Sequence, residues 1–236
     1  MPNGQEKAKV AAYHSNPNVE YAELNGVATT SDDPNDPYDN TIQYTSSKHG
    51  DLHQWAWRKV QAYGAWGEMK GYAAVKVAVI DTGIDNNHED LPAVVAQKDF
   101  INGDDNANDD SGHGTHVAGT IGALSDNRTG VAGAYWNSIG DAGDMRSVEL
   151  IAAKALGASG TGSYSAIASA IDWSVNQGAD AINLSLGGFF RSKTLERAVN
   201  RAWNKGTVLA CSAGNTGNSL KSYPAAYDNC IAVAAT

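Results

Sequence analysis

The sequence has few cysteines, no long apolar run and fewer basic than acidic residues. Its two cysteines are too few for a small disulfide-framed domain, and their spacing matches no zinc-binding pattern. No apolar run reaches the roughly 18 residues that a membrane-spanning helix needs. Asp and Glu number 26 against 17 Lys and Arg, a net charge of −9, which argues against nucleic-acid binding through phosphate neutralisation. We therefore expect a globular protein without nucleic-acid or membrane partners.

Short apolar runs alternate with helical patterns from residue 75 onward, as in an α/β fold. Helical spacing of apolar residues predicts helices that begin near Ser163 and Thr194. Buried parallel strands are expected at 75–81, 148–156, 181–186, 207–211 and 230–236. Strands that alternate with helices predict a three-layer, doubly wound, mostly parallel sheet. Functional groups gather at the carboxyl ends of such strands.

Three segments at or near these strand ends carry residues suited to acyl transfer. Asp81 ends the first strand and precedes a glycine turn, while His113 lies where a glycine-flanked loop enters an apolar helix. Asn215 follows a later buried strand in the segment 211–215. A histidine is a general base, an aspartate fixes its tautomer, and an asparagine amide donates to a developing oxyanion. Together, and in this order, they point to an acyl-transfer site whose nucleophile lies elsewhere.

With these motifs, the chain from about residue 35 to residue 236 resembles the subtilases, the subtilisin-like serine peptidases, most closely their thermitase-like branch. The resemblance implies that Asp81 is the triad acid, His113 the triad base and Asn215 the oxyanion-hole amide, in the Asp, His, Ser order of subtilisin. It also implies a secreted, extracellular, monomeric endopeptidase that cleaves polypeptides. A zinc site at His113 and His116 is disfavoured, because their spacing and the missing glutamate do not match zinc peptidases.

The same resemblance implies a cleft that binds the substrate main chain. One segment would pair with the substrate as an added strand, and two others would form walls of the primary specificity pocket. The implied contacts are, in chain order, Gly160, Thr161, Gly162, Ser185, Leu186, Gly187, Ser212 and Gly214. Glycines in such segments let a peptide backbone approach closely.

Two acidic clusters, one in the segment 32–39 and one in the segment 99–110, have two interpretations. From the residues alone they are solvated loops, whereas the resemblance implies structural Ca²⁺ bound by hard oxygen ligands. The first implied site consists of Asp36, Asp90, Leu124, Asn127, Thr129 and Val131. The second consists of Asp99, Asp104, Asn106 and Asn108. An EF-hand is excluded there, because the loop lacks the required glycine and terminal glutamate.

The family's nucleophilic serine, in a Gly-Thr-Ser-Met-Ala segment, is absent from these 236 residues. Ser185 and Ser212 match other family roles and are no substitutes. We expect residues 31–236 to be a peptidase domain without its C-terminal part, inactive alone. Residues 1–30 have no signal-peptide pattern; 16–23 resemble the propeptide tail that fills the cleft as an intramolecular inhibitor. The alternative is a non-catalytic relative that binds peptides without cutting them.

Two features of the sequence stay open. Cys211 and Cys230 belong to strands expected to be neighbours, and either a disulfide or two buried free thiols fits the sequence. The segment 134–148 is longer than the corresponding family turn and resembles a surface insertion, to which we assign no function.

Overall fold

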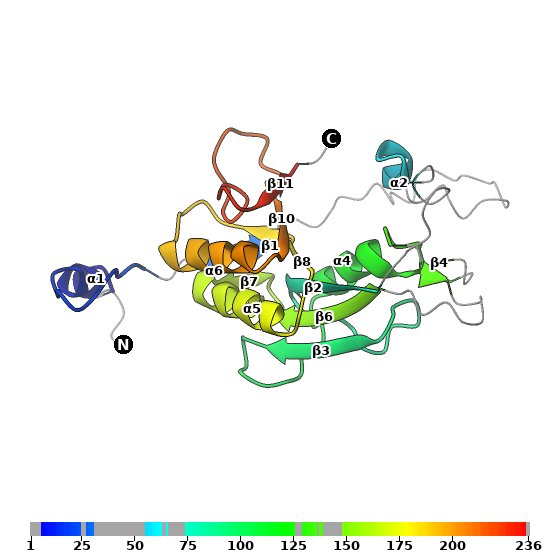
Figure 1. The fold of residues 1–236 in the computed structure, drawn as a ribbon, viewed down its shortest axis with the longest axis horizontal. Helices are drawn as coiled ribbons and strands as arrows, with labels where there is room; N and C mark the ends of the chain where they lie inside the picture. The colour runs from blue at the N-terminus through cyan, green and yellow to red at the C-terminus, as the bar shows by residue number, and fades with distance from the viewer. Residues whose placement is uncertain are drawn as a thin grey trace.

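A computed structural model describes residues 6–24, 27–30, 55–62, 65, 74–125, 129–135, 137–138 and 148–234. Its centre is a six-stranded sheet in the order β11-β10-β8-β2-β6-β3, in which every neighbouring pair is parallel (Figure 1). The strands are β2 (Val75–Asp81), β3 (Val94–Asp99), β6 (Val148–Lys154), β8 (Ala181–Leu184), β10 (Val208–Ser212) and β11 (Ile231–Val233). The expected parallel α/β architecture is confirmed.

Helices cover both faces of this sheet. Ala78 and Ile80 of β2 belong to one buried cluster with the apolar faces of α5 (Tyr164–Asn176) and α6 (Lys193–Asn204). Val79, between them in sequence, belongs to a second cluster with Ala118 of α4 (His113–Gly122). Because successive strand residues point to opposite faces, the two clusters lie on opposite sides of the sheet. The molecule therefore has the three layers that the sequence predicts.

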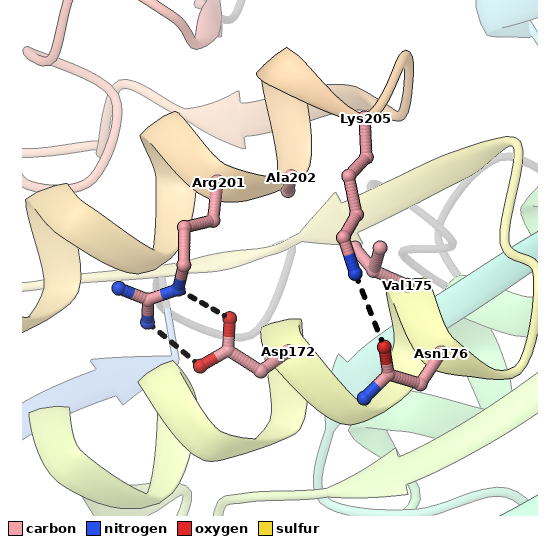
Figure 2. A pocket seen from close by; sticks show the side chains of 6 residues that line it. All are labelled: Asp172, Val175, Asn176, Arg201, Ala202 and Lys205. Atoms are coloured by element: carbon pink, nitrogen blue, oxygen red, sulfur yellow. Dashed lines mark hydrogen bonds and ion pairs between the residues drawn. The ribbon is translucent and has the colours of Figure 1, made fainter.

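Each of the two long helices begins at a serine cap. The Ser163 hydroxyl accepts a hydrogen bond from the Ala166 N–H, and the Ser192 hydroxyl accepts one from the Leu195 N–H. Such caps satisfy backbone donors that have no partner within the helix. The two helices lie side by side, and Arg201 of α6 donates two hydrogen bonds to Asp172 of α5 across a hollow of about 140 Å³ (Figure 2).

A smaller sheet forms beside the main one. Its middle strand is β1 (Val27–Thr30), which pairs antiparallel with both β7 (Thr161–Ser163) and β9 (Leu186–Gly187). The register pairs Ala28 with Gly162 and Thr29 with Gly187. The segment 181–186, expected to be one strand, is divided at Ser185: β8 belongs to the main sheet and β9 to the small one. Each part therefore serves a different sheet.

The remaining described elements are short. They are α1 (Glu6–His14), α2 (Trp55–Lys59), β4 (Leu124–Ser125) and β5 (Asn137–Ser138). α1 has no buried residue and lies apart from the sheet at the N-terminal end (Figure 1). Among the residues described, no helix combines the length and apolarity needed to cross a bilayer.

One prediction about burial was wrong. The run 230–236 was expected to be a buried strand, but β11 is exposed throughout, with Ile231 at 52% and Val233 at 53% exposure. The reason is its position: β11 is the outermost strand on its side of the sheet. Strand β3, at the opposite edge, was not anticipated, because Gln97 and Lys98 interrupt its apolar pattern.

Candidate active site

The carboxyl ends of the parallel strands meet at one edge of the sheet, and most of the candidate residues lie there. β2 ends at Asp81, β6 at Lys154 and β10 at Ser212, while Ser185 follows β8 directly. Parallel strands end on the same side, which is where α/β proteins bind their ligands. Asn215 is exposed in the loop that follows β10.

Asp81 and His113 form a buried acid–imidazole pair. His113 Nδ1 lies 2.7 Å from Asp81 Oδ1, with side-chain exposures of 9% and 0%. The same carboxylate oxygen accepts a hydrogen bond of 2.7 Å from the Thr82 N–H. The second oxygen, Oδ2, is buried, and no described residue donates a hydrogen bond to it. The pair is therefore shielded from water except on the imidazole side.

A glycine brings this pair together. A Cβ atom at Gly114 would lie 2.1 Å from the Gly83 carbonyl oxygen and 3.1 Å from Asp81 Cβ. Any side chain there would push the start of α4 away from the end of β2. Only glycine permits so close an approach of two backbone segments.

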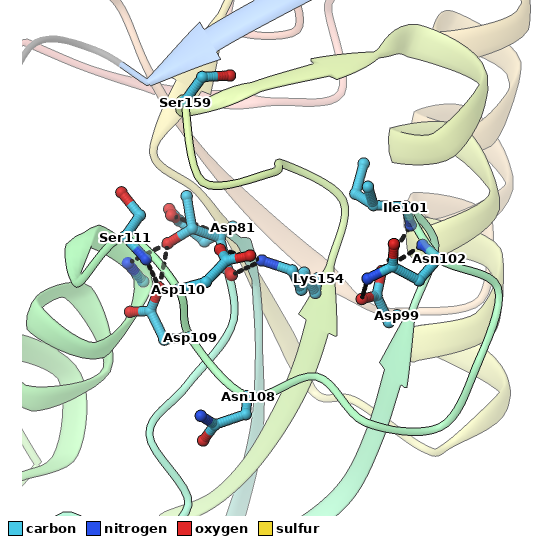
Figure 3. Close-up of polar contacts among 12 residues, drawn as sticks. Asp81, Asp99, Ile101, Asn102, Asn108, Asp109, Asp110, Ser111, Lys154 and Ser159 are labelled. Carbon is cyan, nitrogen blue, oxygen red and sulfur yellow. Dashed lines mark hydrogen bonds and ion pairs between the residues drawn. The ribbon is translucent and has the colours of Figure 1, made fainter.

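Asp109 organises the loop that leads into α4, a role that the sequence did not reveal. Its carboxylate accepts hydrogen bonds from Thr82 Oγ1, Ser111 N, Gly112 N, Thr115 N and Thr115 Oγ1 (Figure 3). Burial raises the pKa of Asp109, but these hydrogen bonds outweigh burial and hold the pKa below its ordinary value. The charged carboxylate thus caps the first turn of α4, whose own N-cap, Gly112, has no side chain.

Lys154 is a second residue that the sequence did not reveal. Its side chain is 2% exposed, and its ammonium donates to the Thr82 carbonyl and to Asp110 Oδ1, both at 2.5 Å (Figure 3). In the β2–β6 register Lys154 stands directly beside Asp81. A buried positive charge therefore lies next to the acid–imidazole pair. The only signal in the sequence is a lysine that ends an apolar strand, Leu150–Lys154.

The segments implied to bind substrate surround β1. β7 and β9 contain four of these residues, Thr161, Gly162, Leu186 and Gly187, and Gly160 precedes them. A Cβ atom at Gly162 would lie 1.9 Å from the Ala155 carbonyl oxygen, so the strand packs tightly against the sheet. Ser212 Oγ donates a hydrogen bond of 3.2 Å to the Leu186 carbonyl, which joins the two wall segments.

Ser185 and Gly214, the other two wall residues, are half-buried. Asn183 Nδ2 donates a hydrogen bond of 2.9 Å to Ser185 Oγ, so this hydroxyl is held by its own strand. A Cβ atom at Gly214, where φ is 90°, would lie 4.0 Å from the side chain of Ser222.

Asp90 lies against the loop implied to complete the first metal site. It is 1% exposed, and its Oδ2 accepts a hydrogen bond of 2.8 Å from the Val131 N–H. Its carbonyl oxygen accepts one of 2.9 Å from the Leu124 N–H. Thr129 belongs to the same loop, whereas Asp36 and Asn127 lie outside the described residues. A buried carboxylate and a loop that bears backbone carbonyls are the donor types that calcium prefers.

The residues of the second implied site are engaged in local turns. Asp99 Oδ1 accepts hydrogen bonds from the backbone N–H groups of Ile101 and Asn102, and Oδ2 accepts one from Asn102 Nδ2. Asp104 accepts one from the Asn106 N–H, and Asn106 accepts one from the Asn108 N–H. Asn108 lies apart from Asp99 (Figure 3).

Across the described ranges, no group of three or more His, Cys, Asp or Glu side chains comes together in a way that could hold a metal ion. The second implied site contains only two side chains of these types, Asp99 and Asp104. For the first implied site, one of its two carboxylates, Asp36, lies outside the described ranges.

Comparison with known proteins finds a family and relatives that match the chain in sequence. Residues 73–236 match the model of the subtilase family, peptidase S8. Thermitase of Thermoactinomyces vulgaris is 41% identical over 204 residues, 86% of this chain and 65% of thermitase. A thermophilic serine proteinase of Bacillus sp. (strain AK1) is 41% identical over 234 residues, 98% of this chain and 53% of that protein. Subtilisin DY of Bacillus licheniformis is 48% identical over 181 residues, 75% of this chain and 60% of subtilisin DY. The chain thus spans about half to two thirds of the length of these relatives.

Proposed function

Because the chain belongs to the subtilase family, we propose that it forms the acid–base part of a serine endopeptidase that hydrolyses polypeptides. The observation that carries the proposal is the 2.7 Å contact between His113 Nδ1 and Asp81 Oδ1 at the strand ends. The nucleophile is a serine that is not among these 236 residues, since no glycine-threonine pair here is followed by serine.

In this reaction each residue has a distinct task. Asp81 accepts a hydrogen bond from the Nδ1–H of His113, and this tautomer lets Nε2 take the proton of the serine hydroxyl. The buried carboxylate then stabilises the imidazolium that forms. Asn215 donates its amide N–H to the oxyanion of the tetrahedral intermediate.

The substrate main chain binds as a strand between β7 and β9. In the described structure β1 occupies that position, which supports an N-terminal segment that inhibits its own domain. Thr29 and Thr30 pair with Gly187 and Leu186. The bond cut during maturation then lies just beyond Thr30, at the boundary between residues 1–30 and 31–236.

Contacts of residues 16–24 with α6 support the same role. The Glu23 carboxylate accepts hydrogen bonds from Ser192 Oγ and from the N–H groups of Lys193 and Thr194, at the start of that helix. The Arg197 guanidinium lies over the ring of Tyr21, and its central carbon is 4.5 Å from the centre of that ring. This docking holds the preceding segment against the helix and directs β1 into the small sheet.

Calcium binding is the remaining part of the proposal, and the first site is the better supported. Asp90 would contribute its carboxylate, with Leu124, Thr129 and Val131 as carbonyl donors and Asp36 and Asn127 as side-chain donors. The ion would join the N-terminal part of the domain to this loop. The second site, Asp99, Asp104, Asn106 and Asn108, has less support because both oxygens of Asp99 already accept hydrogen bonds. We propose further that the enzyme acts as a monomer outside the cell.

The test is casein hydrolysis by the full-length gene product, with and without a serine-directed sulfonyl fluoride. Hydrolysis that the inhibitor abolishes, and that His113→Ala also abolishes, supports the proposal. Peptide binding without hydrolysis in the full-length protein would favour the non-catalytic alternative. For calcium, a chelator should lower the unfolding temperature of the parent protein. The unfolding temperature of the Asp90→Asn variant should be the same with and without the chelator.

A further inference from the structure

The two cysteines of the chain meet at the base of the loop that contains Asn215. Cys211 lies in β10 and is fully buried, and half-buried Cys230 directly precedes β11. The two strands are parallel neighbours, with Ala210 beside Ile231 and Cys211 beside Ala232. The Sγ atoms lie 2.7 Å apart. The two sulfurs are therefore in direct contact across neighbouring strands.

We propose that Cys211 and Cys230 are a redox pair whose disulfide closes the loop of residues 212–229. The backbone already brings the two side chains together across neighbouring strands, so no rearrangement of the sheet is needed to join them. The proposal concerns a covalent modification and does not depend on which reaction the domain catalyses.

The loop that this bond would close contains the residues that shape one side of the cleft. Ser212 Oγ donates to the Leu186 carbonyl, and the backbone groups of Tyr223 and Gly188 donate to each other at 2.8 and 3.0 Å. Asn215, the proposed oxyanion donor, is exposed in the same loop. A cross-link at its base restricts the opened states of this loop more than the folded one.

The accessibility of the two thiols sets the order of the chemistry. The hydrogen bond to Cys230, and then burial, raise the pKa of the Cys211 thiol above its ordinary value, so Cys211 is a poor first nucleophile. The Cys230 thiolate attacks one sulfur of oxidised glutathione, forms a mixed disulfide and expels one glutathione thiolate. Cys211 then loses its proton as its sulfur attacks Cys230 Sγ, and the second glutathione leaves. Two protein thiols are oxidised, and one glutathione disulfide is reduced to two glutathione thiols.

The test uses the intact chain and mass spectrometry. The protein is incubated with oxidised glutathione, denatured, alkylated and digested. We expect a cross-linked peptide pair joined through Cys211 and Cys230. Two alkylated cysteines, or two separate glutathione adducts, would overturn the proposal.

Two matched variants test the order of attack. In Cys211→Ala, Cys230 should persist as a glutathione mixed disulfide; in Cys230→Ala, Cys211 should remain a free thiol. Glutathione on Cys211 in the second variant, with none on Cys230 in the first, would contradict the proposed order.

Limited proteolysis tests the effect on the loop. Cleavage within 212–229 should be at least about tenfold slower in the oxidised chain than in the reduced chain. Cys230→Ala should be cut at one rate with or without reductant. Equal rates for the oxidised and reduced parent chain would mean that the bond does not restrain the loop.

Discussion

Among the described residues, charged side chains at the carboxyl ends of the central strands differ in burial from those on the outer face of α6. At the strand ends, Asp81 and Lys154 are almost completely buried. On α6, Arg201 and its partner Asp172 remain about half exposed (Figure 2). Exposed pairs are screened by water, whereas a buried charge that loses its partner cannot be solvated. The same residue types should therefore respond very differently to substitution.

The largest effect is expected at the acid of the buried pair. Asp81→Asn in the full-length enzyme should lower kcat/KM by on the order of 10⁴-fold, because the amide no longer holds the tautomer in which Nε2 accepts a proton. Peptide hydrolysis is the measurement, with circular dichroism to check folding. A folded variant that keeps a tenth of its activity would remove Asp81 from the triad.

The Lys154–Asp110 pair should respond asymmetrically. Asp110→Asn leaves the buried ammonium without its carboxylate and should cost about 1–3 kcal/mol of unfolding free energy. Lys154→Met should cost less, since Asp110 is 51% exposed and can be solvated when the lysine is removed. Urea unfolding of both variants gives the comparison. A greater loss for Lys154→Met would show that the hydrogen bond from Lys154 to the Thr82 carbonyl, not the pairing with Asp110, dominates.

Substitution of Glu23 should have an effect between those expected for the buried and the exposed pairs. Burial raises the pKa of Glu23, but its hydrogen bonds from Ser192, Lys193 and Thr194 outweigh burial and hold the pKa below its ordinary 4.5. A lowered folded-state pKa means that the contact is fully present above pH 4.5 and is lost as the pH falls through the lower value. Glu23→Ala should weaken the capped helix by about 1 kcal/mol.

Protease protection of residues 6–24 measures this docking. Protection should fall below pH 4.5 in the parent chain and be low at every pH in Glu23→Ala. Glu20→Gln, which alters the neighbouring exposed pair with Arg197, is the matched control and should retain most of the protection. Loss of protection that is as large in the control would show that charge in general, and not the cap, holds the segment.

The smallest effect is expected on the outer face of the helices. Asp172→Asn removes the ion pair with Arg201 but leaves both side chains in water, so the free energy of unfolding should change by less than about 0.5 kcal/mol. The same urea experiment measures it. A change above 1 kcal/mol would mean that this exposed pair behaves like the buried ones.

Local patterns were enough to predict much of the fold. The apolar runs predicted most of the central strands, and the helical spacing of apolar residues predicted a helix that begins near Ser163, the residue that caps α5. Asp81 and His113 were found because each lies in a short glycine-containing motif. Edge strand β3 was missed because its polar residues hide the apolar signal that burial on both faces produces.

The roles of Asp109 and Lys154 depend on contacts distant in the chain. Lys154 donates to a carbonyl 72 residues away, and no local pattern predicts that partner. Asp109 lies in a loop with several other acidic residues, and only the folded loop distinguishes it from Asp104 or Asp105. Sequence patterns therefore located the acid–imidazole pair of Asp81 and His113 better than the residues that hold it in position.

The pairing of β1 with both β7 and β9 has a consequence for the occupancy of the cleft. While β1 is joined to the rest of the chain, its effective concentration at the small sheet is in the millimolar range, whatever the amount of protein. Cutting the chain beyond Thr30 turns the same strand into a separate ligand, whose occupancy then depends on dilution. The cut strand would accordingly occupy the cleft to a large extent in a concentrated solution and leave it largely empty after dilution.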